Sequence, residues 1–195
     1  MSVDVLQYVG SKRKVRVQRR TPCDPLLNGY LLGSSKSLLL MHVFHDFMPD
    51  GYLVFRLEDV EEIRSGPYER HWDEMLEAEG LLDGLDLPVK VDLTTFRAAI
   101  ESISERFRYF MIQSEDPDEP VQDTYVGSFV SATPDSVAFR IFDGRGYWDE
   151  EPVEIDVAEI TKVHFDAPYI NTFSRHLRSG PRPVSLTERS LGSVQ

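Results

Sequence analysis

The sequence contains a single cysteine, Cys23, among its 195 residues. One cysteine excludes an intramolecular disulfide and a zinc site built on several cysteine ligands. No run of about 18 apolar residues is present, which excludes a transmembrane helix. The first residues have no long apolar stretch behind their charges, which excludes a secretory signal. These absences predict a soluble cytoplasmic protein.

Basic residues are scarce as well. Lys and Arg number 21 against 33 Asp and Glu, so the formal net charge is -12. A protein that coats nucleic acid or an anionic membrane needs a basic surface, so this balance argues against both classes. Hydrophobic residues make up 41% of the chain, which is enough for a packed core and argues against disorder.

The sequence also lacks the common catalytic motifs. It has no G-x-x-x-x-G-K-[ST] phosphate loop, no H-E-x-x-H and no G-x-S-x-G. Gly144-Arg145-Gly146 lies between two expected strands and is therefore interpreted as a hairpin turn. The acidic residues at 58–62 are interpreted as a solvated rim of a turn. We therefore expect no enzyme, no catalytic residue and no cofactor.

One group of residues has the chemistry of a metal site. His42, His45 and Asp46 could supply three ligands and leave one position open. On a strand, however, residues 42 and 45 point to opposite faces. The alternation favours surface histidines at a strand end, and no metal is expected.

Charge is unevenly distributed along the chain. Residues 1–45 carry a net charge of +5 and residues 161–195 carry +3, which leaves -20 for residues 46–160. Solubility and internal charge pairing are enough to explain this pattern. The functional alternative is that an anion or a nucleic acid contacts the basic N-terminal cluster, which consists of Lys12, Arg13, Lys14, Arg16, Arg19 and Arg20.

The chain contains an internal repeat. Residues 59–63 read Asp-Val-Glu-Glu-Ile, and residues 156–160 read Asp-Val-Ala-Glu-Ile, an offset of 97. Further matches are Gly29 with Gly127 and Pro67-Tyr68 with Pro168-Tyr169. Two copies indicate two similar small domains, because a solenoid needs at least three repeats.

Each copy is predicted to consist of short strands separated by turns. The first has strands at 15–19, 30–32, 38–44 and 52–57, a turn at Met48-Pro49-Asp50-Gly51, a fifth strand after Val60 and a helix at 68–79. The second begins with a helix, on which Phe96, Ile100 and Ile103 form an apolar stripe. Its strands are expected at 107–113, 125–132, 137–142, 153–155 and 162–165, and a helical segment at 169–177.

A helix followed by five bent strands resembles the Sm-like fold. The chain is also similar to a set of uncharacterised bacterial proteins with two tandem Sm-like or SH3-like small barrels, through residues 51–60, 127–130, 147–152 and 155–160. The resemblance implies a mainly β (α+β) chain of two five-stranded antiparallel barrels, with a helix preceding the second. The expected parts are 1–85, 86–178 and a flexible tail at 179–195.

The resemblance implies binding or assembly more than catalysis. No RNA site is carried over, because Arg64-Ser65-Gly66 lacks the adjacent basic–glycine pair of the RNA-binding families. The prediction is a non-enzymatic cytoplasmic adaptor that binds a protein partner, has no membrane contact and is a monomer or a homodimer. Tyr147 and Trp148 follow a glycine turn and are candidate partner contacts. The alternative is RNA or nucleotide binding through the basic N-terminal cluster, although the net charge disfavours nucleic acid.

Overall fold

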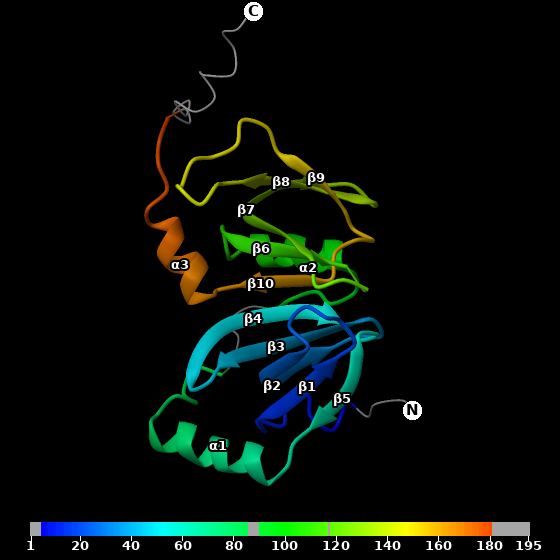
Figure 1. Ribbon diagram of the computed structural model, residues 1–195, viewed down its shortest axis with the longest axis vertical. Coiled ribbons are helices and arrows are strands. Elements are labelled where there is room, and N and C mark those ends of the chain that lie inside the picture. Colours follow the sequence, from blue (N-terminus) through cyan, green and yellow to red (C-terminus); the bar gives the residue numbers. More distant parts are fainter. Residues whose placement is uncertain (1–4, 86–89, 117, 181–195) are drawn as a thin grey trace, which may run out of the picture.

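The computed structural model describes residues 5–85, 90–116 and 118–180. It is mainly β with three helices, which confirms the predicted fold class at this level, and α2 precedes the second set of strands as predicted (Figure 1). In chain order the elements are β1 (Val15–Arg19), β2 (Leu26–Ser34), β3 (Leu38–His45), β4 (Met48–Arg56), β5 (Val60–Arg64), α1 (Pro67–Ala78), α2 (Phe96–Ser104), β6 (Phe110–Glu115), β7 (Gln122–Ala132), β8 (Ser136–Ile141), β9 (Val153–Asp156), β10 (Lys162–Phe165) and α3 (Pro168–Ser174).

The ten strands found in the described residues belong to one open antiparallel sheet with the order β5-β1-β2-β3-β4-β10-β6-β7-β8-β9. The order has an internal repetition, because the fifth strand of each half pairs with the first, followed by the second, third and fourth. The halves meet where β4 pairs with β10. Among the described strands, β5 and β9 are therefore the two edges of the sheet.

The two halves also agree in register. Val15 pairs with Gly29 in the first half, and Phe110 pairs with Gly127 in the second. Each second strand is irregular two residues after its glycine, at Leu31 in β2 and at Phe129 in β7. A bulge bends a strand and increases its twist, so each second strand bends at the same point.

Gly29 and Gly127 are needed because the neighbouring strand comes very close. A Cβ at Gly29 would lie 1.9 Å from the carbonyl oxygen of His42, and one at Gly127 would lie 2.0 Å from that of Arg140. Gly29 also has a φ of +151°, which L side chains rarely adopt. Only glycine fits at these two points of the sheet.

The ladder corrects the alignment of the repeat in one place. Phe55 and Ile155 pair with corresponding residues of the third strands, and Ile63 and Val163 pair with corresponding residues of the first strands. The structural offset there is 100 residues, so the offset of 97 from the pentapeptides 59–63 and 156–160 is wrong by three. Residues 59–63 lie mostly within β5, whereas residues 156–160 begin at the end of β9 and continue into the loop before β10.

The predicted turn at residues 48–51 is also in a different place. The turn between β3 and β4 consists of Asp46 and Phe47, and β4 already begins at Met48. Asp46 has a φ of +52°, a conformation that Asp tolerates better than most residues. Pro49 pairs with Phe44 at an irregular point of the ladder, where a missing N–H is tolerated.

One apolar core spans both halves. Side chains alternate along β4, so that Tyr52 and Val54 enter this core while Leu53 and Phe55 enter a separate core inside the first half. Helix α2 contributes Phe96 and other residues to the shared core. The domain boundary predicted at residue 85 stays a prediction, and apolar packing continues across it.

His42 is enclosed by aromatic side chains within the first half. It is only 6% exposed, its ring stacks on Tyr52 at 4.5 Å between centroids, and Phe44 lies 5.0 Å away. Its Nδ1 has no hydrogen-bond partner among the described residues. Burial lowers the pKa of His42 to about 4, against a small opposing effect of the Asp166 charge.

We expect this histidine to make stability depend on pH. The unfolded chain takes up the proton near pH 6.5, whereas the folded chain takes it up only near pH 4, so acid favours unfolding between these values. The free energy of unfolding should fall by about 2 kcal/mol between pH 7 and pH 5. Urea unfolding at both pH values measures it. His42→Phe should remove most of this fall, and an equal fall in the variant would assign it to other groups.

Candidate functional site

Tyr147 and Trp148 are positioned by a tight turn between β8 and β9. The carboxylate of Asp143 accepts hydrogen bonds from the backbone N–H groups of Arg145 and Tyr147, both at 2.9 Å. Gly146 completes the turn with a φ of +84°, and its carbonyl accepts a hydrogen bond of 2.8 Å from the N–H of Arg178. The turn therefore holds the two aromatic residues and fixes the chain that leaves α3.

Trp148 rests on other rings. Its ring packs edge-on against Phe142 at 5.3 Å, and Phe142 stacks on Phe173 of α3 at 5.4 Å. Tyr109, just before β6, lies 6.1 Å from Trp148. Trp148 and Tyr147 are both half-buried, so each ring has one side in contact with the protein and another at the surface. Such support fixes side chains before any ligand arrives.

Four arginines lie over these rings. Arg108 is 5.2 Å from the centroid of Tyr109, and Arg140 is 5.6 Å from that of Trp148. Arg145 and Arg178 lie 5.8 and 5.3 Å from the ring of Tyr147, and Arg178 also donates a hydrogen bond of 3.2 Å to its hydroxyl. We name this surface the Trp148 patch; it consists of Arg108, Tyr109, Arg140, Arg145, Tyr147, Trp148 and Arg178.

A cavity of about 640 Å³ opens on the patch. It is lined by Arg140, Trp148 and Arg178 together with the acidic residues Asp149 and Glu150. Arg145 is paired with Asp143 at 3.4 Å. The patch therefore combines flat rings and guanidinium groups with nearby carboxylates, and it is not a uniformly basic surface.

The basic N-terminal cluster is divided by the fold. Lys14 is 2% exposed, and its ammonium lies 4.2 Å above the ring of Trp72. The pKa of Lys14 is lowered, because the effect of burial outweighs the opposing effect of the nearby Glu69 charge. Arg19 is 1% exposed. These two side chains are therefore unable to reach a surface ligand, which corrects the prediction for them.

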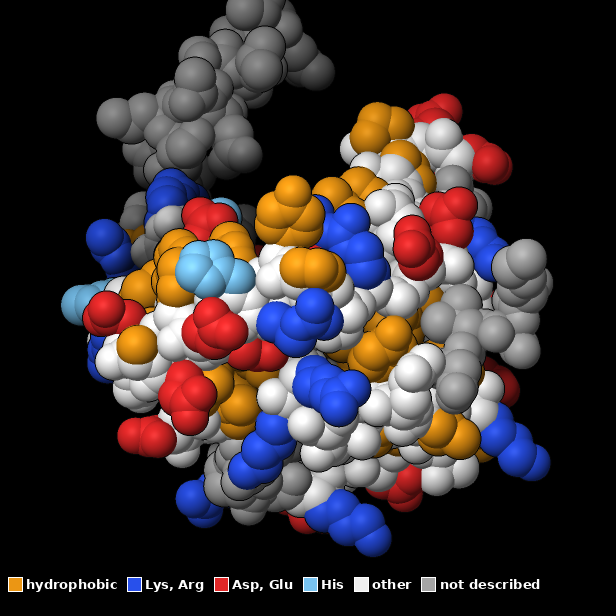
Figure 2. Space-filling view, turned by 90° about the horizontal axis from the view of Figure 1, so that it is seen from below, with side chains coloured by type: hydrophobic (Ala, Val, Ile, Leu, Met, Phe, Trp, Pro, Cys, Tyr) orange, Lys and Arg blue, Asp and Glu red, His pale blue; other side chains and the backbone are white. Residues whose placement is uncertain are grey.

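The other four members are at least partly accessible. Arg16 donates from Nε to Asn28 at 3.3 Å, Lys12 lines a cavity, and Arg13 and Arg20 are exposed. Seen from the end that carries α1, Lys and Arg side chains are separated by apolar and uncharged surface (Figure 2). Their role as an anion or nucleic-acid contact stays a prediction.

Arg19 belongs to a buried ion cluster that links the two halves. Its guanidinium hydrogen-bonds both carboxylate oxygens of Glu115 on β6 and lies 3.5 Å from Asp59. Lys162 on β10 pairs with Glu115 at 3.0 Å and with Asp24 at 2.7 Å. Burial would raise the pKa of Glu115, but the hydrogen bonds and charges of Arg19 and Lys162 outweigh it and hold that pKa below its usual range.

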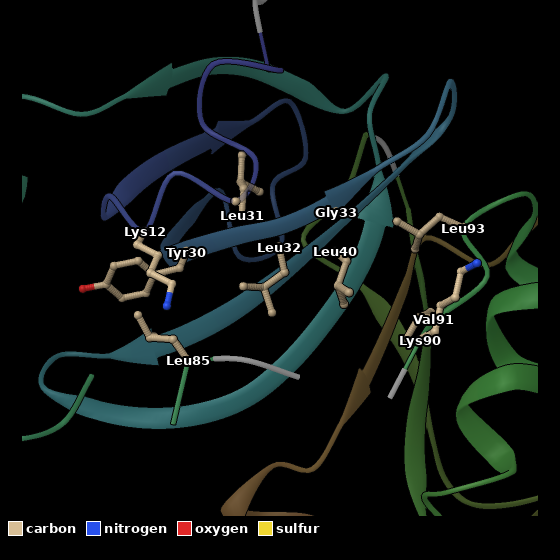
Figure 3. Close-up of a pocket in the computed structure, with 11 residues that line it drawn as sticks. Lys12, Tyr30, Leu31, Leu32, Gly33, Leu40, Leu85, Lys90, Val91 and Leu93 are labelled. Carbon is tan, nitrogen blue, oxygen red and sulfur yellow. The ribbon is translucent and has the colours of Figure 1, made fainter. Parts of the chain in front are cut away.

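A second cavity, of about 360 Å³, lies beside β2 (Figure 3). Leucine and valine side chains form much of its wall, and the nitrogen of Lys12 lies beside Tyr30 and Leu85 (Figure 3). The hydroxyl of Tyr30 donates a 2.5 Å hydrogen bond to Asp73. Burial, with the Asp73 carboxylate, raises the pKa of Tyr30 well above its usual range, so this hydroxyl is unsuited to act as a base.

The histidine pair is not arranged as a metal site. His42 is enclosed by rings, whereas His45 is exposed and lies 3.8 Å from Asp46. In the described part of the chain, no group of three or more His, Cys, Asp or Glu side chains is placed to hold a metal ion. Within the same residues, no helix is both long and apolar enough to cross a membrane.

Comparison with protein-family models, with curated proteins and with solved structures finds no match.

Sequence reasoning selected Tyr147 and Trp148 but missed the rest of the patch. Arg145 lies in the same turn, and the other missing residues come from three other segments, before β6, on β8 and after α3. One local signal was available, because residues 106–109 read Arg-Phe-Arg-Tyr and alternate basic with aromatic side chains. Nothing local indicates that this segment lies beside the turn at 143–146.

Proposed function

We propose that the protein is a non-enzymatic, cytoplasmic binding or adaptor protein whose two halves are Sm-like (SH3-like) small barrels. The repeated strand order and the matching glycines at 29 and 127 support two related halves. A small set of barrel folds serves many unrelated functions, so the function is argued from the site and not from this likeness.

The Trp148 patch carries the proposal. Trp, Tyr and Arg are the residue types that contribute most of the binding energy in protein interfaces, while Lys, Glu and Asp are depleted there. In this chain with a net charge of -12, the described patch gathers two tyrosines, one tryptophan and four arginines. The arginines lie on the rings, so that less side-chain freedom is lost on binding.

The same geometry defines the partner. A flat apolar or aromatic group fits against the exposed side of Trp148. Carboxylates on the partner fit Arg108, Arg140 and Arg178, because guanidinium groups pair with carboxylates through two hydrogen bonds. The partner is therefore a protein surface that has an apolar anchor surrounded by acidic residues.

Truncating Trp148 should abolish this interaction. Trp148→Ala removes the central ring and the support for Arg140, so partner recovery should fall about tenfold or more. The measurement is affinity capture from a lysate of the source organism, with quantitative mass spectrometry. Tyr68→Ala is the matched control, because Tyr68 is 77% exposed on α1, far from the patch (Figure 1).

Recovery of the same protein by wild type and Tyr68→Ala, but not by Trp148→Ala, supports the proposal. Equal recovery with all three chains contradicts it. Circular dichroism of each variant establishes that the fold is intact.

RNA binding is the second candidate. Unpaired bases stack on aromatic rings and on guanidinium planes, and the patch offers both. A labelled single-stranded RNA, titrated at low and at moderate salt, tests it. Salt-dependent binding that Trp148→Ala weakens assigns the patch to RNA, and binding lost only with Arg13→Ala and Arg20→Ala assigns it to the N-terminal cluster. Absence of binding at low salt rejects both.

A further inference from the structure

The outer edge of β9 in the second half corresponds to the edge of β4 in the first half, and that edge of β4 binds β10. Strand β4 pairs with β3, and its other side pairs with β10. Strand β9 pairs with β8 in the corresponding register, since Phe55 and Ile155 both face corresponding residues of the third strands. Among the described residues, no strand occupies the outer side of β9.

The free backbone groups of β9 are identified by the register. The N–H of Val157 donates to the carbonyl of Asp135 at 2.9 Å. Hydrogen-bonded pairs alternate in an antiparallel ladder, so Val153 and Ile155 direct their backbone groups to β8. The N–H and C=O of Glu154, the N–H of Asp156 and the C=O of Pro152 therefore face outward. An incoming strand can form several backbone hydrogen bonds with them.

Side chains at this edge alternate in kind. Ile155 is 3% exposed, and Val153 packs on the same shared core. Glu154 and Asp156 are exposed on the opposite face, and Glu150 and Glu151 precede the strand. An added strand would continue the apolar face opposite Val153 and Ile155, and it would need positive charge opposite Glu154 and Asp156.

A second copy of this chain does not meet that requirement. The strand equivalent to β10 in the first half is β5, the other edge of the sheet. Paired with β9 in the register of β4 and β10, it would place Glu61 opposite Asp156 and Ile63 opposite Glu154. Like charges directly opposite each other are destabilising, and the isoleucine would face a carboxylate. The acidic residues therefore oppose self-association and favour a basic strand.

We propose that β9 binds an extended segment of a partner protein in which basic and apolar residues alternate, as an added antiparallel strand. The inference rests on the proposed function, because β9 continues directly from the Trp148 patch through residues 149–152. The partner thus presents acidic residues to the arginines of the patch and a basic–apolar strand to β9.

Short peptides test this binding mode directly. The probe is an acetylated, amidated, fluorescently labelled peptide Ser-Lys-Val-Lys-Val-Ser, titrated into the full chain and followed by anisotropy. Binding is expected for this peptide and not for the matched Ser-Glu-Val-Glu-Val-Ser peptide. Methylation of the backbone nitrogen of the second lysine, which faces β9 opposite Glu154, should abolish binding. Methylation at the following valine, whose nitrogen points away, should leave it within about twofold.

Variants of the protein assign the site. Glu154→Lys should weaken binding of the basic peptide about tenfold, whereas Glu77→Lys, an exposed charge reversal on α1, should leave it unchanged. Equal affinity of both methylated peptides, or equal affinity of both protein variants, overturns the inference. Concentration-dependent dimers in sedimentation that Glu154→Lys alters would make a second copy the occupant, which also overturns it.

The proposed function is tested separately. If Trp148→Ala loses a captured partner that Glu154→Lys retains, the adaptor role stands and the added strand is wrong. If the basic peptide binds as expected but no partner depends on Trp148, the edge site stands and the role of the patch is wrong.

Discussion

Replacing Arg19 by methionine should lower the free energy of unfolding by about 3–5 kcal/mol. Arg19 is 1% exposed and supplies half of the positive charge in an ion cluster in which Glu115 and Lys162 are also buried, while Asp59 is half-buried and Asp24 is exposed. Without it, the buried carboxylate of Glu115 and the more accessible carboxylates of Asp59 and Asp24 share the single ammonium of Lys162. The cost comes mainly from buried charge left without a partner, because an intact buried pair contributes little net stability. Urea unfolding at pH 7 measures the change.

Two further variants separate charge from packing. Arg20→Met removes an exposed neighbouring arginine and should change stability by less than about 0.5 kcal/mol. Adding Glu115→Gln to Arg19→Met removes one uncompensated charge at constant size and should recover part of the loss. A loss below about 1 kcal/mol in Arg19→Met would show that the cluster is open to water in solution.

Replacing Gly29 by alanine should cost about 4 kcal/mol or more, at the upper end of single substitutions. The added Cβ would lie 1.9 Å from a backbone carbonyl, and backbone moves aside less easily than a side chain. Gly127→Ala should behave alike, because its Cβ would meet a carbonyl at 2.0 Å. Chemical denaturation of both variants provides the measurement.

Gly144→Ala is the matched control for both glycines. A Cβ at Gly144 meets nothing within 4 Å, so this substitution should change stability by less than about 1 kcal/mol. If Gly29→Ala were as stable as this control, β2 and β3 would have to lie further apart in solution than in the structure.

Local patterns predicted most elements of the fold. Val15 and Val17 alternate with polar residues, so β1 was predicted at its observed bounds, and the stripe from Phe96 to Ile103 predicted α2. Where Gly and Pro were interpreted as turn residues, the prediction was wrong at residues 48–51. Pro49 fits there because the ladder is irregular, a property of the paired strand and not of the segment itself.

Local patterns do not predict the contact between the two halves or the composition of the Trp148 patch. Nothing near Arg19 in sequence shows that Glu115, 96 residues away, lies within hydrogen-bond distance. The sequence therefore predicts Arg19 as part of a surface cluster, whereas the structure buries it. The Trp148 patch was found only at its one contiguous pair, because tertiary packing brings Tyr109 and Arg178 to the turn.

Strand β4 has a consequence for the history of the chain. Tyr52 and Val54 belong to the core shared with the second half, while Leu53 and Phe55 belong to the core of the first. If the halves arose by duplication of one gene segment, the copies lost their independence when β4 paired with β10. A substitution on one face of this strand is then constrained by the packing of the shared core, and a substitution on the other face by the packing of the core of the first half. Selection would therefore act on the packing of the two copies together, although their strand order still preserves the repetition.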